Sequence, residues 1–136
     1  MKTMVVAYAG AAAAMLAMDA VWLSLAVDVL YRPLLGEILL LQFRPVPAVL
    51  FYALYVMGVV IFAVRPALAI GRWPAAAGKG ALLGFLCYAT YDLTNQATLK
   101  IWPAAVTIVD MAWGTFLTAC TATAGYLAAS RFGRLG

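Results

Sequence analysis

Three aspartates stand alone within long apolar stretches of this 136-residue chain, at Asp19, Asp92 and Asp110. A charged side chain at the centre of a bilayer costs about 2.5 to 3.5 kcal/mol on insertion scales, so each acid needs a polar partner. Carboxyl groups held away from water can exchange protons or bind cations. The sequence therefore predicts a polar site inside the protein that is built on these three acids.

Tyrosines and an asparagine fall at the same depth as the aspartates. With a helical rise of 1.5 Å per residue, Asp19 lies about 12 Å from the outer end of its apolar run. By the same rise, Asp92 and Asp110 each lie about 9 Å from the outer ends of theirs. We expect one binding cluster in this layer, made of Asp19, Tyr52, Tyr55, Tyr88, Asp92, Asn95 and Asp110. The competing interpretation is that these groups only hydrogen-bond the helices together.

The elements that position these residues are membrane-spanning helices. Hydrophobic residues make up 67% of the chain and charged residues 10%, whereas a soluble domain carries about 25% charged residues. We therefore predict an all-α fold, a single domain in which four transmembrane helices form a bundle. The predicted spans cover about residues 4–27, 46–64, 75–98 and 104–129.

Small residues indicate which helix faces meet. One face of the third span carries, every four residues, Gly80, Gly84, Tyr88, Asp92 and Gln96. The two glycines allow close helix contact. The fourth span has a comparable face of small and polar residues: Thr107, Asp110, Gly114, Thr118, Thr121 and Gly125. Both faces should turn toward the interior, which places their aspartates inside the bundle.

The first and last spans share the spacing D-x-x-W, at Asp19 with Trp22 and at Asp110 with Trp113. Two short matches do not establish an internal duplication. We expect the tryptophans to pack or to anchor at the interface, and the tyrosines to hydrogen-bond to the aspartates.

Prolines and basic residues predict where the spans end and how they are oriented. Prolines stand at or near the expected helix starts, and Pro66 suits the exit of the second span. Six basic residues fall on one side: Lys2, Arg65, Arg72, Lys79, Arg131 and Arg134. Three fall on the other: Arg32, Arg44 and Lys100. The positive-inside rule then places both termini in the cytoplasm of an inner (plasma) membrane.

The connection between the first two spans, residues 28–45, is unusually apolar for a loop. Its apolar-rich stretch 34–43 is too short to cross a membrane, so we expect an interfacial or re-entrant segment. Packing under a partner subunit is the other explanation. The first run itself continues past Asp19 to Val27, longer than a typical signal-peptide core, so we expect a retained helix rather than a cleaved signal.

Several classes of function lack the residues that they need. The chain has no histidine, and its two cysteines, Cys87 and Cys120, fall inside predicted spans. We expect both to be buried as small apolar residues without a disulfide. We expect no cofactor and no metal site. The nine basic residues are scattered, so the net charge of +4 does not indicate nucleic-acid binding. The expected partners are the lipid bilayer and a second copy of the chain or a larger membrane complex.

Short motifs resemble those of a known family. The stretch 88–102, YATYDLTNQATLKIW, is followed by VDMAWGT at 109–115, with MDAVW at 18–22 and FYALYVMG at 51–58. This combination of YDLTN and DxxWG resembles an uncharacterised family (a domain of unknown function) of small bacterial four-helix inner-membrane proteins. The resemblance covers nearly the whole chain. It implies a bacterial inner membrane and four spans, and it brings no substrate.

Three functions compete at this point. The first is a transporter-like or channel-like protein whose carboxyl cluster binds a proton, a cation or a cationic solute. The second is a membrane enzyme acting on a lipid or another apolar substrate, although no nucleophile–base motif or phosphate loop is present and the catalytic residues are unknown. The third is a structural or assembly subunit of a larger complex. Small multidrug exporters have a similar size and helix number, but likeness at the level of the fold is weak support for a function.

Overall fold

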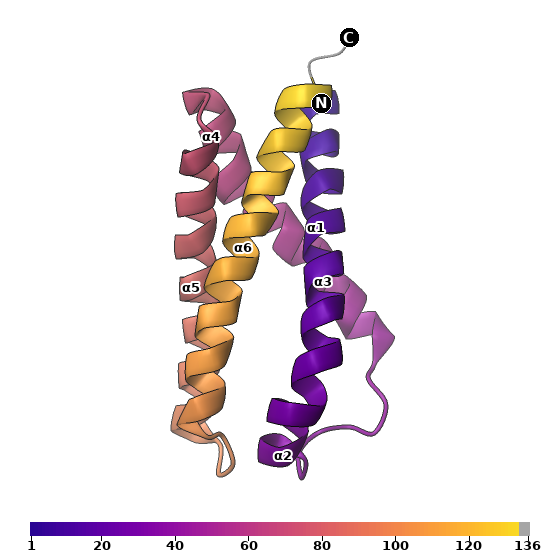
Figure 1. Ribbon diagram of the computed structural model, residues 1–136, viewed down its shortest axis with the longest axis vertical. Helices are drawn as coiled ribbons and strands as arrows, with labels where there is room; N and C mark the ends of the chain where they lie inside the picture. Colours follow the sequence, from indigo (N-terminus) through magenta and orange to yellow (C-terminus); the bar gives the residue numbers. More distant parts are fainter. Residues whose placement is uncertain (134–136) are drawn as a thin grey trace.

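The computed structural model describes residues 1–133, which are helical throughout except for short connections and contain no strand. The expected all-α bundle is therefore confirmed over this range, and Arg134, one of the six basic residues counted above, lies outside it. The elements in chain order are α1 (Lys2–Ala26), η1 (Val27–Tyr31), α2 (Arg32–Leu35), α3 (Pro45–Val59), η2 (Val60–Val64), α4 (Arg65–Ile70), α5 (Trp73–Thr98) and α6 (Ala104–Phe132). The elements α1, η1 and α2 are continuous and form the first rod, and α3, η2 and α4 are continuous and form the second. With α5 and α6 as the third and fourth, the molecule consists of four long rods (Figure 1).

Two wide turns, η1 and η2, keep the first two rods continuous across a proline. Each is a π-helical turn followed at once by an Arg-Pro pair, at 32–33 and at 65–66. A proline inside a helix has no N–H, and its ring collides with the carbonyl four residues earlier. In both turns the arginine N–H instead reaches the carbonyl five residues earlier, that of Val27 or Val60. This wider geometry accommodates the proline without breaking the helix.

The first two helices are consequently longer than the predicted spans. The helix expected to stop near Val27 continues to Leu35, and the one expected to stop at Val64 continues to Ile70. Pro66 does not mark an exit, because η2 absorbs it. The second rod ends instead at Gly71, whose φ of 76° is left-handed and is readily adopted only by glycine.

The connection after the first rod is shorter than expected. Leu34 and the buried Leu35 complete the last turn of α2, so only residues 36–44 lie between the rods. Leu41 and Phe43 in this connection are exposed. The apolar segment predicted for residues 34–43 is thus part helix and part exposed loop.

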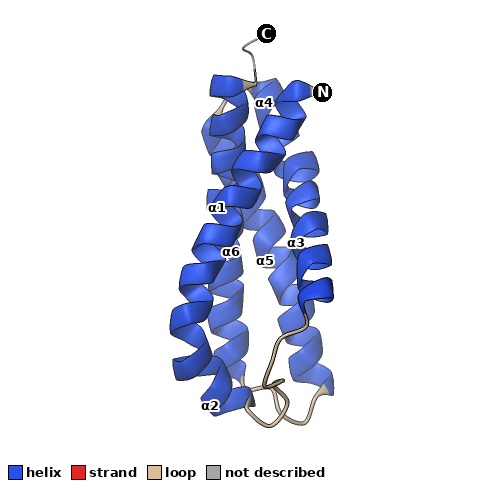
Figure 2. Ribbon diagram, turned by 90° about the vertical axis from the view of Figure 1, so that its right-hand side faces the viewer, coloured by secondary structure: helices blue, strands red, loops and turns tan. Residues whose placement is uncertain are grey.

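The helix α6 is the centre of the bundle. It packs along α5 on one side and along α1 on the other. The second rod crosses behind them on a diagonal: its end at η2 and α4 packs against α5, whereas α3 packs against α1 (Figures 1 and 2). The end of α1 at Lys2 and the end of α6 at Phe132 lie at the same end of the molecule (Figure 1).

Glycines allow the close contact between α5 and α6. A Cβ atom at Gly84 would lie 2.2 Å from the carbonyl oxygen of Gly114, and one at Gly80 would lie 2.6 Å from that of Thr118. At Gly114 an added Cβ would lie 2.2 Å from the ring of Tyr88. The small-residue face predicted for the third span is therefore the face that meets α6.

Three of the rods in the described part of the chain are long and apolar enough to cross a membrane: Lys2–Leu35, Pro45–Ile70 and Ala104–Phe132. Large apolar side chains cover their outer surfaces, as expected where lipid rather than water surrounds a bundle. The helix α5 is as long as a span requires, at 26 residues, but it does not meet the same measure of apolarity. Its role as a fourth span remains a prediction.

Candidate functional site

Asp19 lies on α1, is 7% exposed, and accepts two hydrogen bonds from other helices. The hydroxyl of Tyr52 on α3 donates to Oδ2 over 2.9 Å, and Nε1 of Trp113 on α6 donates to Oδ1 over 3.1 Å. The expected bond between a tyrosine and a buried aspartate is confirmed here. Because both oxygens are used, Asp19 ties three rods together.

Asp110 lies on α6, is 8% exposed, and is held by a different residue of the first rod. The Tyr31 hydroxyl donates a short hydrogen bond to Asp110 Oδ1. The same hydroxyl accepts a bond of 3.1 Å from Nε1 of Trp22. A chain of hydrogen bonds thus runs from Trp22 through Tyr31 to the acid.

The two D-x-x-W segments meet across the antiparallel helices α1 and α6. The rings of Trp22 and Trp113 stack with centroids 4.5 Å apart and planes within 8°. Trp113 donates to the aspartate of the other segment, and Trp22 donates to the tyrosine that holds Asp110. The tryptophans therefore pack, as expected, and each also orients an acid.

Asp92 on α5 has a different environment. It is fully buried, at 0% exposed, and neither of its carboxyl oxygens has a hydrogen-bond partner among the described residues. The carboxyl of Asp110 and the ring of Trp102 are its polar neighbours. Buried polar groups are almost always paired with protein, water or an ion, so the two unpaired oxygens of Asp92 are unusual for a buried position.

Other unpaired polar groups occur near this end of α5 and α6. Trp102 Nε1 and Thr107 Oγ1 are buried without a partner. Trp102 lies in the connection between α5 and α6, and its ring meets Tyr91 edge-on with centroids 5.6 Å apart. Thr107 stands one helical turn before Asp110, on the same face of α6. The pair Asp92 and Asp110 therefore has a ring N–H and a hydroxyl group close by.

The three aspartates turn inward, as expected, and they differ in their hydrogen-bond partners. The single binding cluster stays a prediction. Asp92 and Asp110 are neighbours, whereas Asp19 is hydrogen-bonded to Tyr52 and Trp113. Tyr88 interacts electrostatically with both Asp19 and Asp110. The helical rise predicts the depth of each acid along its helix axis, but the direction of each side chain around that axis depends on how the helices pack.

The remaining residues of the predicted cluster have varied partners. The Tyr55 hydroxyl and Thr118 Oγ1 are hydrogen-bonded over 2.8 Å, so Tyr55 does not bond to an aspartate. Tyr88 packs its ring on Gly114 and makes no hydrogen bond within the described residues. Asn95 is half-buried and lies beside Tyr91.

An aromatic cavity of about 440 Å³ lies between α3 and α5. Its lining consists of Phe51, Tyr55, Cys87, Tyr88 and Tyr91. Cys87 is exposed on this surface, contrary to the expectation of a buried small apolar residue, and both cysteines are free. Tyr88 in this lining interacts electrostatically with Asp19 and Asp110, so the cavity adjoins the aspartates.

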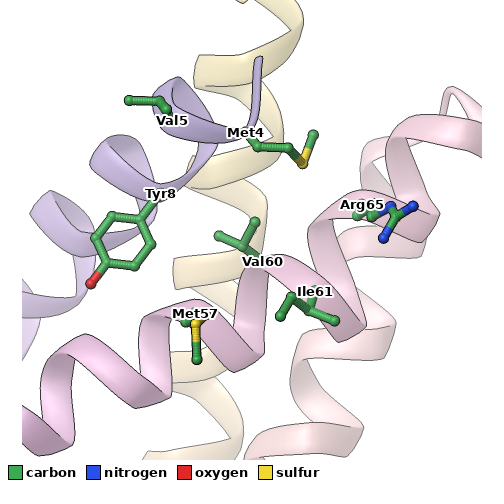
Figure 3. A pocket seen from close by; sticks show the side chains of 7 residues that line it. All are labelled: Met4, Val5, Tyr8, Met57, Val60, Ile61 and Arg65. Atoms are coloured by element: carbon green, nitrogen blue, oxygen red, sulfur yellow. The ribbon is translucent and has the colours of Figure 1, made fainter. Parts of the chain in front are cut away.

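A second cavity, of about 430 Å³, lies nearer the opposite end of the molecule, between α1 and the second rod (Figure 3). Its lining is apolar except for Tyr8 and Arg65, and Figure 3 shows Arg65 at one edge. No acid lines it, so this cavity is separate from the aspartate cluster. Within residues 1–133, no three His, Cys, Asp or Glu side chains come together as a metal site.

Tyr31 is the site residue that the sequence analysis missed. We ended the first span at Val27 and treated the following residues as a connection, whereas η1 carries the helix on and directs Tyr31 to Asp110. The available signal was the lack of any helix-breaking residue between Val27 and Pro33. A proline in a membrane helix need not end it.

Apolar rods that enclose hydrogen-bonded acids and tyrosines define a helical membrane protein. Residues 4–127 match the family model described as "Predicted membrane protein (DUF2177)", and the chain belongs to this family. The resemblance to an uncharacterised membrane-protein family is thereby confirmed. No curated protein and no solved structure matches the chain.

Proposed function

We propose that this protein is transporter-like or channel-like and that Asp92 and Asp110 form its intramembrane site for a proton, a cation or a cationic solute. The single observation that carries the proposal is Asp92, a fully buried acid with two unpaired oxygens. Ionisable groups within membrane helices are costly and mark ion or proton pathways. A partner that supplies positive charge would satisfy these oxygens.

The surroundings of the acid pair support this choice. Two adjacent carboxyl groups can share one proton or can both coordinate one cation, and hydroxyl groups extend an oxygen ligand set. Thr107 provides an unused hydroxyl, and Tyr31 already donates to Asp110. Asp19, by contrast, has both oxygens bonded to neighbouring helices, which suits a structural role.

The proposal requires that α5 crosses the membrane as a fourth span, because Asp92 would otherwise lie outside the bilayer. The close packing of α5 on α6 supports this, since it hides the small and polar face of α5 against another helix. With four crossings both termini lie on one side, and the excess of basic residues near Lys2, Arg72 and Arg131 favours the cytoplasm.

Proton flux into liposomes that contain the purified protein tests the proposal. A pH-sensitive dye inside the vesicles reports flux when an inside-negative potential is imposed. We expect wild type to exceed empty vesicles and Asp92→Asn to lose most of the flux. Asp28→Asn, which alters an exposed acid paired with Arg32, should behave as wild type. Equal flux in wild type and Asp92→Asn would remove the proposed role of Asp92.

A further inference from the structure

The aromatic cavity between α3 and α5 has a composition that selects for a kind of ligand. Four of its five lining residues are aromatic: Phe51, Tyr55, Tyr88 and Tyr91. The rings of Phe51 and Tyr55 lie close together, with centroids 5.4 Å apart. The faces of such rings attract cations, and they also provide apolar contact area.

Acids stand behind this lining. Asp19 interacts electrostatically with Tyr55 and Tyr88, and Asp110 interacts with Tyr88 and Tyr91. No basic residue contributes to the lining. The electrostatic environment of the cavity therefore favours positive charge, while its surface is almost wholly apolar.

The cavity is accessible from the side of the bundle. Phe51 is 43% exposed and Tyr91 is 58% exposed, so the two ends of the lining reach the outer surface. The helices α3 and α5 make few contacts with each other, because the second rod diverges from α5 toward α1. A volume of about 440 Å³ falls within the range of about 300 to 1,000 Å³ of small-molecule pockets.

We infer that this cavity binds a lipophilic cation, a molecule with an apolar body around one positive charge, which approaches from the bilayer. The aromatic rings would contact the apolar body, and the acids behind Tyr88 would stabilise the charge. This inference rests on the proposed function and narrows the cationic solute to one chemical class. A small hydrated metal ion would gain little from an apolar aromatic lining.

Binding of tetraphenylphosphonium to the purified protein in detergent tests the inference, with tetraphenylborate as an anion of matched shape. We expect the cation to bind and the anion to bind at least ten-fold more weakly. Phe51→Ala and Tyr91→Ala should each weaken cation binding roughly 2- to 30-fold, the range expected for losing one cation–π contact. Both residues are exposed at the outer surface, so the fold should tolerate the changes.

Phe85→Ala is the matched control, because Phe85 is an exposed aromatic residue of α5 that does not line the cavity. It should bind the cation as wild type does. The inference is overturned if the two probes bind alike, if the lining variants bind as wild type, or if Phe85→Ala weakens binding equally. If cation binding fails these tests but proton flux still depends on Asp92, the inference is wrong and the proposed function stands. Selective cation binding without that flux would contradict the role of Asp92 alone.

Discussion

At the scale of single residues, the three buried aspartates differ in the hydrogen bonds that their carboxyl oxygens accept. Asp19 accepts bonds from Tyr52 and Trp113 and thereby joins three rods. Asp110 accepts from Tyr31. Asp92 accepts from no described residue. The same residue type is thus hydrogen-bonded to two neighbouring helices at one position and unpaired at another.

The role of Asp19 predicts a measurable energetic coupling. Asp19→Ala leaves the Tyr52 hydroxyl and Trp113 Nε1 without their acceptor, and it should lower the free energy of unfolding by about 1 to 3 kcal/mol. Tyr52→Phe removes only one bond and should cost about 0.6 kcal/mol, an average value for hydrogen bonds between membrane helices. Unfolding in mixed detergent micelles measures both.

A double-mutant cycle separates this bond from other effects of the substitutions. Once Asp19 is alanine, Tyr52→Phe should cost almost nothing further, because the acceptor is already absent. Equal costs of Tyr52→Phe in the two backgrounds would show that the bond does not stabilise the fold.

At the scale of elements, glycine positions decide how closely α5 approaches α6. Gly84→Ala places a Cβ atom 2.2 Å from a backbone oxygen of α6, and we expect a loss of about 1 to 3 kcal/mol in stability from such overpacking. Gly78→Ala on the same helix meets nothing within 4 Å. It should be neutral or stabilise by up to about 1 kcal/mol through helix propensity. Comparison of the two unfolding curves checks the packing, and equal stability would contradict it.

The elements also show how far the sequence alone could lead. Apolar runs and the glycine spacing predicted the helices and the inward face of Asp92, because both depend on local periodicity. The continuation through η1 and η2 was not predicted, because a proline usually ends a helix and the wide turn that tolerates it has no strong local signal. Because the continuation through η1 was not predicted, Tyr31 was not expected to reach Asp110. Pairing of Asp92 with Asp110, rather than with Asp19, depends on rotation of packed helices and could not be derived from depth.

At the scale of the whole molecule, α6 is central, and α1 and α5 flank it. This arrangement brings Asp110 near Asp92 on one neighbour and brings Trp113 to Asp19 on the other. The diagonal second rod closes the bundle at α4 and diverges from α5 at α3, where the aromatic cavity lies. The acid pair and the cavity therefore both follow from the packing order of the rods.

Thiol bridging tests the central claim, that Asp92 on α5 and Asp110 on α6 are neighbours inside the bundle and that Asp19 on α1 does not contact Asp92. In a background with Cys87 and Cys120 replaced by alanine, the pair Asp92→Cys with Asp110→Cys should form a disulfide or react with a short dithiol-bridging reagent in high yield. The pair Asp19→Cys with Asp92→Cys should not. Peptide mass analysis of the membrane-embedded protein identifies each bridge. Efficient bridging of the second pair, or none in the first, would contradict the account.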